Sequence, residues 1–279
     1  MYIKPKKRLG QNFLIDKNIQ RKIISSCGLS KEDIVLEIGS GMGDLTQLLA
    51  ITAKKVYALE VDHRLFPLLE QKLSSHANFQ LIKASILQFD INKFLLNNPP
   101  GQKIKVIGNI PYYISSPIIE HLIQYRANID SVFMTVQKEF GRRVNAAAGS
   151  KEYGSFSCFV QYYALSRIVF EIKKGSFRPV PKVDSCFLSL KFRQKPPVKV
   201  SDEGRFFELI RAAFNQRRKT LRNSLAGFIT SSSLEEFLDQ QGIDRNVRAE
   251  RLSLEEFARL NSFIGSRNLR AGELKLRGA

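Results

Sequence analysis

Short apolar runs alternate along the first half of the chain with stretches in which apolar residues recur at helical spacing. The runs are typical of buried strands, and they lie near residues 34–38, 55–60, 79–83, 105–109 and 131–137. The helical spacing predicts helices over residues 15–29, 45–53, 62–74 and 116–125. Strands that alternate with helices predict a parallel sheet with helices wound on both of its faces.

The pattern changes in the second half of the chain. Two more strands are expected near residues 165–172 and 185–192, and a breaker-rich segment after them predicts a linker. Apolar spacing then predicts short helices, one capped by Ser232 or Ser233 and one beginning with a capping box at Ser253. We therefore expect three parts, a sheet domain over residues 1–195, a helical domain over 205–264 and a disordered tail over 265–279.

Three glycines follow the first predicted strand, at positions 39, 41 and 43. Glycine tolerates positive φ and lets the backbone approach a ligand closely, and the helix behind the loop offers unpaired N–H groups. The spacing differs from the dinucleotide fingerprint G-x-G-x-x-G because Asp44 stands where its last glycine would be.

Two acidic residues restrict the kind of ligand that this loop can bind. Glu37 precedes the first glycine, where a carboxylate opposes a pyrophosphate and suits a cationic or amine-bearing ligand. Glu60 ends the second strand, at the distance expected of a carboxylate that binds ribose hydroxyls. The combination indicates a nucleoside site, which fits S-adenosylmethionine better than NAD.

Asn109-Ile-Pro-Tyr112 follows a later buried strand. The Asn109 side-chain oxygen and the carbonyl before Pro111 can both accept hydrogen bonds from a planar amino group, and Tyr112 can stack on the attached ring. Acceptors that draw both protons make the nitrogen lone pair more nucleophilic, as alkylation of an adenine amine requires. The alternative interpretation is a turn that ends the strand.

These features occur with others in one order along residues 4–263, and together they resemble the class I S-adenosylmethionine-dependent methyltransferases, specifically the small-subunit (16S) rRNA adenine dimethyltransferases. The matching blocks are Leu9–Leu14, Glu37–Gly43, Glu60, Asn109–Tyr112, Val136–Glu139, Tyr153–Ser155, Phe177–Ser185 and Phe214–Arg222. The resemblance implies a Rossmann-like α/β sheet, mostly parallel with an antiparallel edge strand, and a small all-helical C-terminal domain.

The resemblance also implies roles for individual residues. S-adenosylmethionine would be held by Gln11, Asn12, Leu14, Glu37, Gly39, Gly41, Glu60, Val61, Ser85 and Asn109. The catalytic residues would be Asn109, Pro111, Tyr112 and Phe177, with the Tyr112 and Phe177 rings on the two faces of the target base. For Phe177 the alternative is a core aromatic ring. No general base is required, since the methylated nitrogen is strongly acidic before it loses its proton.

Ser85 departs from the family, which usually has an Asp there to accept a hydrogen bond from the cofactor's adenine amine. A hydroxyl can accept that bond but lacks the strength of a charged acceptor. Asp90 lies five residues later and is the candidate to compensate.

Charge agrees with a nucleic-acid partner. The chain has 44 Lys and Arg against 26 Asp and Glu, a formal net charge of +18, which is typical of polyanion binders. A predicted helix over 217–222 carries Arg217, Arg218, Lys219 and Arg222. This helix would contact RNA phosphates or present a solvated face. The implied partner is the small ribosomal subunit with its 16S rRNA, of which two adjacent adenines near the 3′ end would each receive two methyl groups.

Other observations exclude classes of function. The three cysteines and three histidines lack the spacing of metal ligands, so no metal is expected. No apolar run reaches transmembrane length and the N-terminus lacks a signal-peptide core, so we expect a cytoplasmic monomer without a membrane partner.

Three other functions stay open. The nearest is the macrolide-resistance type of methyltransferase, which modifies an adenine of large-subunit rRNA on the same fold. A DNA adenine methyltransferase fits less well, because Ile110 stands where those enzymes usually have a first proline. The third is a ribosome-assembly or transcription factor that keeps the fold without catalysis.

Overall fold

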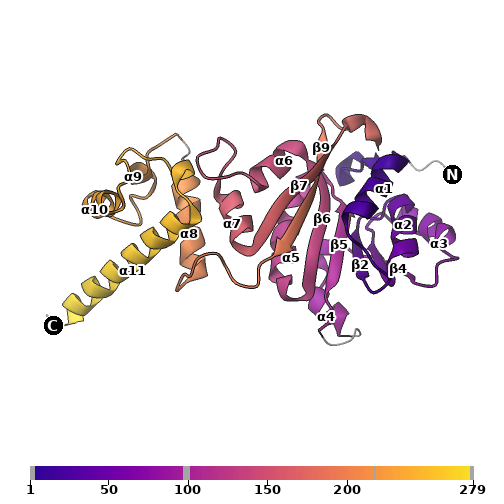
Figure 1. The fold of residues 1–279 in the computed structure, drawn as a ribbon, viewed down its shortest axis with the longest axis horizontal. Helices are drawn as coiled ribbons and strands as arrows, with labels where there is room; N and C mark the ends of the chain where they lie inside the picture. The colour runs from indigo at the N-terminus through magenta and orange to yellow at the C-terminus, as the bar shows by residue number, and fades with distance from the viewer. Residues whose placement is uncertain (1–3, 97–100, 217, 277–279) are drawn as a thin grey trace. The chain divides into compact units, whose positions relative to one another are not determined.

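The structure is a computed structural model that describes residues 4–96, 101–216 and 218–276. The chain divides into two compact units (Figure 1). The first unit comprises residues 1–142 and 164–192, and the second comprises residues 143–163 and 193–279. This division corrects the boundary expected from the sequence, because residues 143–163 belong with the second unit and not with the sheet.

The first unit is built on a seven-stranded sheet in the order β4-β3-β2-β5-β6-β9-β7. Its strands are β2 (Ile34–Ile38), β3 (Lys55–Leu59), β4 (Phe79–Ile82), β5 (Ile104–Asn109), β6 (Ile129–Gln137), β7 (Ala164–Ile172) and β9 (Ser185–Phe192). All were predicted. The first five strands in this order, from β4 across to β6, pair in parallel. Strand β9 runs antiparallel to both β6 and β7. The expected antiparallel strand therefore lies one position in from the edge, between β6 and β7.

Helices and short 3-10 turns precede, connect and follow the parallel strands. They are α1 (Lys17–Ser26), α2 (Asp44–Thr52), α3 (Phe66–Lys72), α4 (Ile91–Leu95), α5 (Ser115–Gln124) and α6 (Lys138–Val144), with short 3-10 turns η1 (Lys7–Leu9), η2 (His63–Leu65), η3 (Ile86–Gln88), η4 (Tyr112–Ile114), η5 (Arg126–Asn128) and η6 (Lys174–Ser176). One apolar core joins Ile23 of α1 and Leu49 of α2 to Val35 and Ile107 of the sheet. Burial on this scale supplies most of the driving force for folding.

The winding of the sheet reverses between β2 and β5, since the chain passes from β2 to β3 on one side while β5 lies on the other. Loops that leave such neighbouring strands diverge and open a crevice outside the carboxyl ends of the strands. Gly39 follows β2, and Asn109 ends β5. The topology therefore brings the two predicted motifs to the same place.

A separate two-stranded sheet pairs β1 (Phe13–Leu14) with β8 (Phe177–Arg178). The main-chain N–H of Ile15 extends this contact by donating to the Ser176 carbonyl over 2.9 Å. The N-terminal segment is thereby fixed to a part of the chain that follows β7. No sequence pattern predicted this pair.

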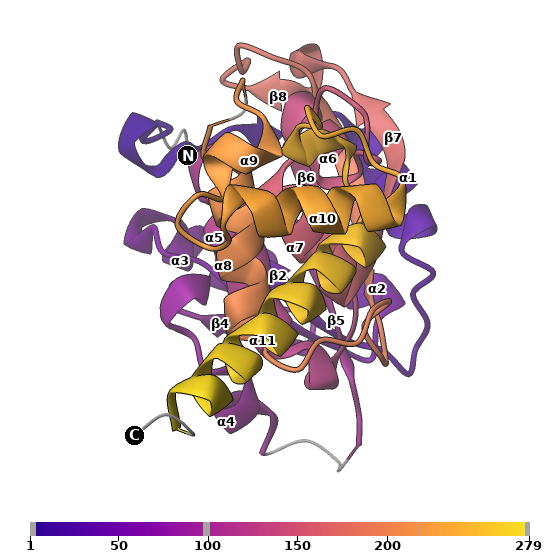
Figure 2. The ribbon, with the colours of Figure 1, turned by 90° about the vertical axis from the view of Figure 1, so that its left-hand side faces the viewer.

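The second unit is helical, with α7 (Ser155–Tyr163), α8 (Glu203–Phe214), α9 (Leu221–Ser224), α10 (Ser231–Gln241), η7 (Ala249–Arg251) and α11 (Leu254–Leu276) (Figure 2). Helix α7 belongs here because Cys158 and Tyr162 are buried in the same apolar core as Phe206 of α8. No helix in the described parts of the chain has the length and apolarity to cross a bilayer.

The helix boundaries confirm one cap and correct two other expectations. The capping box is present, since the Ser253 N–H donates to Glu256 Oε2 over 2.7 Å and the Glu256 N–H donates to Ser253 Oγ over 3.2 Å. Thr230 caps α10, because its hydroxyl accepts from the Ser233 N–H, so Ser232 and Ser233 are not the cap. Helix α11 continues to Leu276, past the expected start of a disordered tail.

Candidate active site

A cavity with an empty volume of about 750 Å³, counted to its solvent-open mouth, lies at the carboxyl ends of β2, β3 and β5. Predicted site residues make up much of its lining, namely Gln11, Asn12, Gly39, Gly41, Glu60, Val61, Ser85, Asn109, Pro111 and Tyr112. A smaller cavity of about 380 Å³ shares Gly39, Gly41 and Asn109 with the first, and Leu14 and Glu37 line it. The structure thus brings both predicted motifs and the N-terminal segment together.

The glycine loop has the backbone that its sequence predicts. Gly39 and Gly41 have φ angles of 74° and 56°, in the left-handed region that favours glycine. A Cβ atom on Gly41 would come within 3.1 Å of the Phe13 ring. Glycine is therefore required at position 41 both for the turn and for the close approach of the N-terminal segment.

Glu60 closes the loop from the neighbouring strand. Its Oε2 accepts from the Gly41 N–H over 2.9 Å, and its Oε1 accepts from the N–H groups of Val61 and Asp62, each over 2.8 Å. Each carboxylate oxygen has about two acceptor positions, so three donors leave about one position open, on Oε2. Because Glu60 lines the cavity, that position could accept from a ribose hydroxyl.

Glu37 is a buried carboxyl group, only 2% exposed. Burial raises its pKa to about 7, the Thr46 hydroxyl opposes the shift, and the Glu60 charge adds to it. Glu37 Oε2 has no hydrogen-bond partner among the described residues, and a buried acceptor without a partner is costly. Glu37 also lines the smaller cavity.

Asn109 is oriented by the N-terminal segment. Its side-chain Nδ2 donates to the main-chain oxygen of Asn12 over 2.8 Å. The amide nitrogen is thereby held by the protein, and the side-chain oxygen Oδ1 is left as the atom that this amide offers as an acceptor. This is the orientation required to accept a hydrogen bond from a substrate amine.

The Tyr112 ring is held by its hydroxyl, which forms a hydrogen bond of 2.6 Å with Ser185 Oγ at the start of β9. Burial raises the pKa of this phenol, and the hydrogen bond with Ser185 opposes that shift. The hydroxyl is therefore protonated and serves as an anchor, while the ring lines the cavity.

Phe177 is not at the cavity. Its ring is fully buried, in the core that contains Ile23 and Phe187, and its backbone pairs with Leu14. The stacking role expected from the family is thus not present in this conformation, and the alternative interpretation as a core aromatic ring describes the structure. Alternating apolar positions cannot distinguish a ring that faces a core from one that faces a cavity.

Ser85 lines the cavity, at the start of η3, as the alignment with the family required. Asp90 does not line it, because its carboxylate caps α4 by accepting from the Lys93 N–H over 3.0 Å. Asp90 therefore does not compensate for the missing acidic residue. The neutral hydroxyl of Ser85 is what this part of the cavity offers.

The basic block at 217–222 is not the helix that was predicted. Helix α8 ends at Phe214, and α9 begins only at Leu221. Arg218 and Lys219 lie exposed in the turn between them, and Arg217 lies outside the described residues. Arg222 forms an ion pair with Glu235 over 3.0 Å, so its positive charge is partly neutralised within the second unit.

Two residues that hold the site were missed by the sequence analysis. Ser185 anchors Tyr112, and Asp62 binds the N-terminal segment. An acidic residue two positions after Glu60 was a visible signal, but only the fold shows what it contacts. In the described ranges, no three His, Cys, Asp or Glu side chains gather closely enough to hold a metal ion.

The two cavities together fit S-adenosylmethionine. Glu60 and Ser85 line the larger one, where the nucleoside would lie, and Glu37 lines the smaller one, where a carboxyl group would suit the cationic amino-acid end. Gly39, Gly41 and Asn109 line both. The sulfonium would then lie beside Asn109, the residue expected to receive the target amine.

Comparison with known proteins shows the family of the chain. Residues 3–265 match the family described as ribosomal RNA adenine dimethylase. A ribosomal RNA small subunit methyltransferase A from Lachnoclostridium phytofermentans is 44% identical over 92% of this chain and 91% of its own length. One from Clostridium botulinum is 42% identical over 92% of this chain and 93% of its own length.

Two solved structures have the same fold. The 23S rRNA methyltransferase ErmE is 27% identical, with a TM-score of 0.72 over 91% of this chain and 100% of its own. A dimethyladenosine transferase from Plasmodium falciparum is 24% identical, with a TM-score of 0.71 over 88% of this chain and 94% of its own. The chain belongs to the ribosomal RNA adenine dimethylase family, whose members are enzymes that use S-adenosylmethionine.

Proposed function

We propose that the protein dimethylates two adjacent adenines in the 3′-terminal hairpin loop of 16S rRNA in the small ribosomal subunit. The orientation of Asn109 carries this proposal, because its oxygen is left to accept from an amine at the wall that both cavities share. The small-subunit assignment is supported by relatives named ribosomal RNA small subunit methyltransferase A at 42–44% identity.

The residues of this chain supply alignment and activation. Bound S-adenosylmethionine provides an electrophilic methyl group and a good leaving group. Tyr112 holds one face of an adenine that has left its stack, while Asn109 Oδ1 and the main-chain carbonyl of Ile110 accept from its amine. These acceptors keep the nitrogen lone pair in line with the methyl group. After transfer, the nitrogen releases its proton without a dedicated base.

Incubation with radiolabelled cofactor and unmethylated small subunits, followed by mapping of the labelled nucleotides, tests this proposal. We expect label on two adjacent adenines of the 3′-terminal hairpin. Label elsewhere in the small-subunit rRNA would contradict the assignment of the target.

Methylation of large-subunit rRNA is the second candidate, supported by the TM-score of 0.72 to a 23S rRNA methyltransferase. Unmethylated large subunits therefore belong in the same assay. Label on the large subunit alone would replace the first proposal by the second. Cofactor binding without label on either particle would favour a factor that keeps the fold without catalysis.

A further inference from the structure

The segment over residues 4–14, here named the N-terminal strap, borders the larger cavity with Leu9, Gly10, Gln11, Asn12 and Phe13. It is attached to the acceptor side of the site in two places. Asn12 accepts from Asn109, and a Cβ on Gly10 would come within 3.0 Å of the Tyr113 ring. The strap therefore forms a wall of the cavity for as long as its first residues stay in place.

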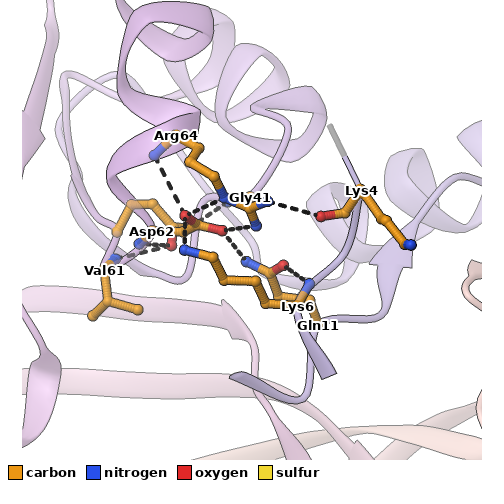
Figure 3. Close-up of polar contacts among 8 residues, drawn as sticks. Lys4, Lys6, Gln11, Gly41, Val61, Asp62 and Arg64 are labelled. Carbon is orange, nitrogen blue, oxygen red and sulfur yellow. Dashed lines mark hydrogen bonds and ion pairs between the residues drawn. The ribbon is translucent and has the colours of Figure 1, made fainter. Parts of the chain in front are cut away.

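Asp62 holds those first residues (Figure 3). Its Oδ1 accepts from Lys6 Nζ and its Oδ2 accepts from Gln11 Nε2, each over 3.0 Å. Arg64 binds both oxygens of the same carboxylate over 3.0 and 2.6 Å, and donates from its other nitrogen to the Lys4 carbonyl over 3.2 Å. Three side chains thus meet on one carboxylate.

Asp62 also contacts Glu60, which lines the same cavity. Its main-chain N–H donates to Glu60, the carboxylate expected at the ribose. Its side chain is fully buried, and both oxygens are occupied by the strap and Arg64. The carboxylate therefore cannot serve as a ligand of the cofactor itself.

The Asp62 carboxylate offsets the positive charge of the strap. Residues 4–14 contain Lys4, Lys6, Lys7 and Arg8 and no acidic residue. Lys6 and Arg64 would repel each other without a negative charge between them. The Arg64 guanidinium, the largest influence, holds the pKa of Asp62 well below its usual range, and Gln11 and Lys6 act in the same direction.

We propose that Asp62 is a positioning residue for S-adenosylmethionine, which acts by holding the N-terminal strap against the ribose-binding turn. Loss of its charge would release residues 6–11 and enlarge the mouth of the cavity. The inference concerns cofactor binding alone, so it stands or falls independently of which rRNA is the substrate.

Asp62→Asn is the direct test, because it keeps the shape and removes the charge. Asp33→Asn is a matched control, since Asp33 binds Lys105 over 3.1 Å and lies before β2, at the amino ends of the parallel strands. Calorimetry should show that Asp62→Asn binds S-adenosylhomocysteine about tenfold more weakly, the loss expected for a charged hydrogen bond. Asp33→Asn should keep the wild-type affinity.

Limited trypsin digestion supplies a readout that needs no cofactor. The strap has cleavable bonds after Lys6, Lys7 and Arg8, whereas Pro5 protects the bond after Lys4. We expect Asp62→Asn to be cut at these bonds roughly ten times faster than wild type, as the same free-energy change applied to opening of the strap implies. Equal cleavage of Asp62→Asn, Asp33→Asn and wild type would overturn the proposal.

A double-mutant cycle separates this role from a general loss of stability. Lys6 does not line the cavity, so Lys6→Ala removes only the strap's side of the ion pair. The two substitutions together should weaken binding by less than the product of their separate effects. Fully additive losses of binding free energy would contradict the proposal that Lys6 and Asp62 act through the same ion pair. Lys6→Ala alone should still weaken binding if Asp62→Asn fails to fold, and wild-type affinity there would also count against the proposal.

Discussion

Asn109 and Asn12, 97 residues apart in the sequence, are joined by a hydrogen bond of 2.8 Å from the Asn109 side chain to the Asn12 carbonyl. The bond fixes which end of the Asn109 amide faces the ligands. The acceptor that we propose for the substrate amine is therefore in position before the substrate arrives, and preorganised groups of this kind give large effects in catalysis.

We expect Asn109→Ala to lower the rate of methyl transfer by about a hundredfold, the cost typical of one preorganised hydrogen-bonding group. Cofactor affinity should fall much less than the rate, because Glu60, the glycine loop and the contacts of Asp62 with the N-terminal strap remain. Single-turnover rates and calorimetry would measure the two effects separately. Asn128→Ala, at a half-buried Asn that bonds to Asn92, is the control. Near-normal turnover in Asn109→Ala would exclude the activating role.

Tyr112 should act mainly through its ring. Tyr112→Ala is expected to reduce transfer by about ten- to a hundredfold, since stacking of a base on an aromatic ring is worth about 1–3 kcal/mol. Tyr112→Phe keeps the ring and loses only the bond to Ser185, so it should reduce transfer a few-fold. Ser185→Ala should match Tyr112→Phe, and the double variant should be no worse than either. A further loss in the double variant would show that Ser185 has a second role.

Ser85→Asp is expected to tighten cofactor binding about fivefold, because a hydrogen bond to a charged acceptor is stronger by about 1 kcal/mol. The gain should vanish with a cofactor analogue in which hydrogen replaces the adenine amine. Calorimetry with both ligands measures this. Asp90→Asn, which alters the cap of α4 and not the cavity, should leave both affinities unchanged. An equal gain for both ligands would indicate simple attraction to the sulfonium.

Glu37 makes the stability of the cofactor-free protein depend on pH. Its pKa is raised from 4.5 to about 7, so it contributes stability that is complete below pH 4.5 and lost as the pH rises through 7. Between about pH 5 and pH 8 the free energy of unfolding of wild type should fall relative to that of Glu37→Gln by up to about 3 kcal/mol. The melting temperature of wild type should fall with it and is the quantity to measure. A difference that is constant with pH would contradict the buried, protonated state of this carboxyl.

Binding to the ribosomal particle should weaken steeply with salt. On a plot of the logarithm of the binding constant against the logarithm of the salt concentration, each phosphate contact that is lost lowers the magnitude of the slope by about 1. Replacement of Arg218 and Lys219 by Ala should therefore lower it by about 2. Arg222→Ala should lower it less, because Glu235 already pairs with that side chain. An unchanged slope in the double variant would favour a solvated surface for this turn.

The parallel sheet and the ligand loops were predictable because their signals are local. A buried strand, a glycine turn and an acidic residue at the end of the next strand each lie within a few residues, and the winding rules then place them together. The same holds for the capping box at Ser253.

The errors at the candidate site and in the basic block concern contacts between distant parts of the chain. The helix expected over 217–222 begins only at Leu221, whose N–H donates to the Val247 carbonyl, a contact that no pattern within the block reveals. Phe177 was placed at the base by resemblance to the family, and its sequence position does not show that its ring lies in the core. Asp62 and Ser185 bind partners 51 and 73 residues away, at Gln11 and Tyr112.

The pairing of β1 with β8 has a consequence for synthesis of the enzyme. Leu14 leaves the ribosome early, yet its partner Phe177 is made only after most of the sheet. At about 5–20 residues per second, the wait lasts roughly ten to thirty seconds. A nascent chain that ends before β8 therefore contains every residue that lines the larger cavity, but it lacks the strand that pairs with the N-terminal segment beside that cavity.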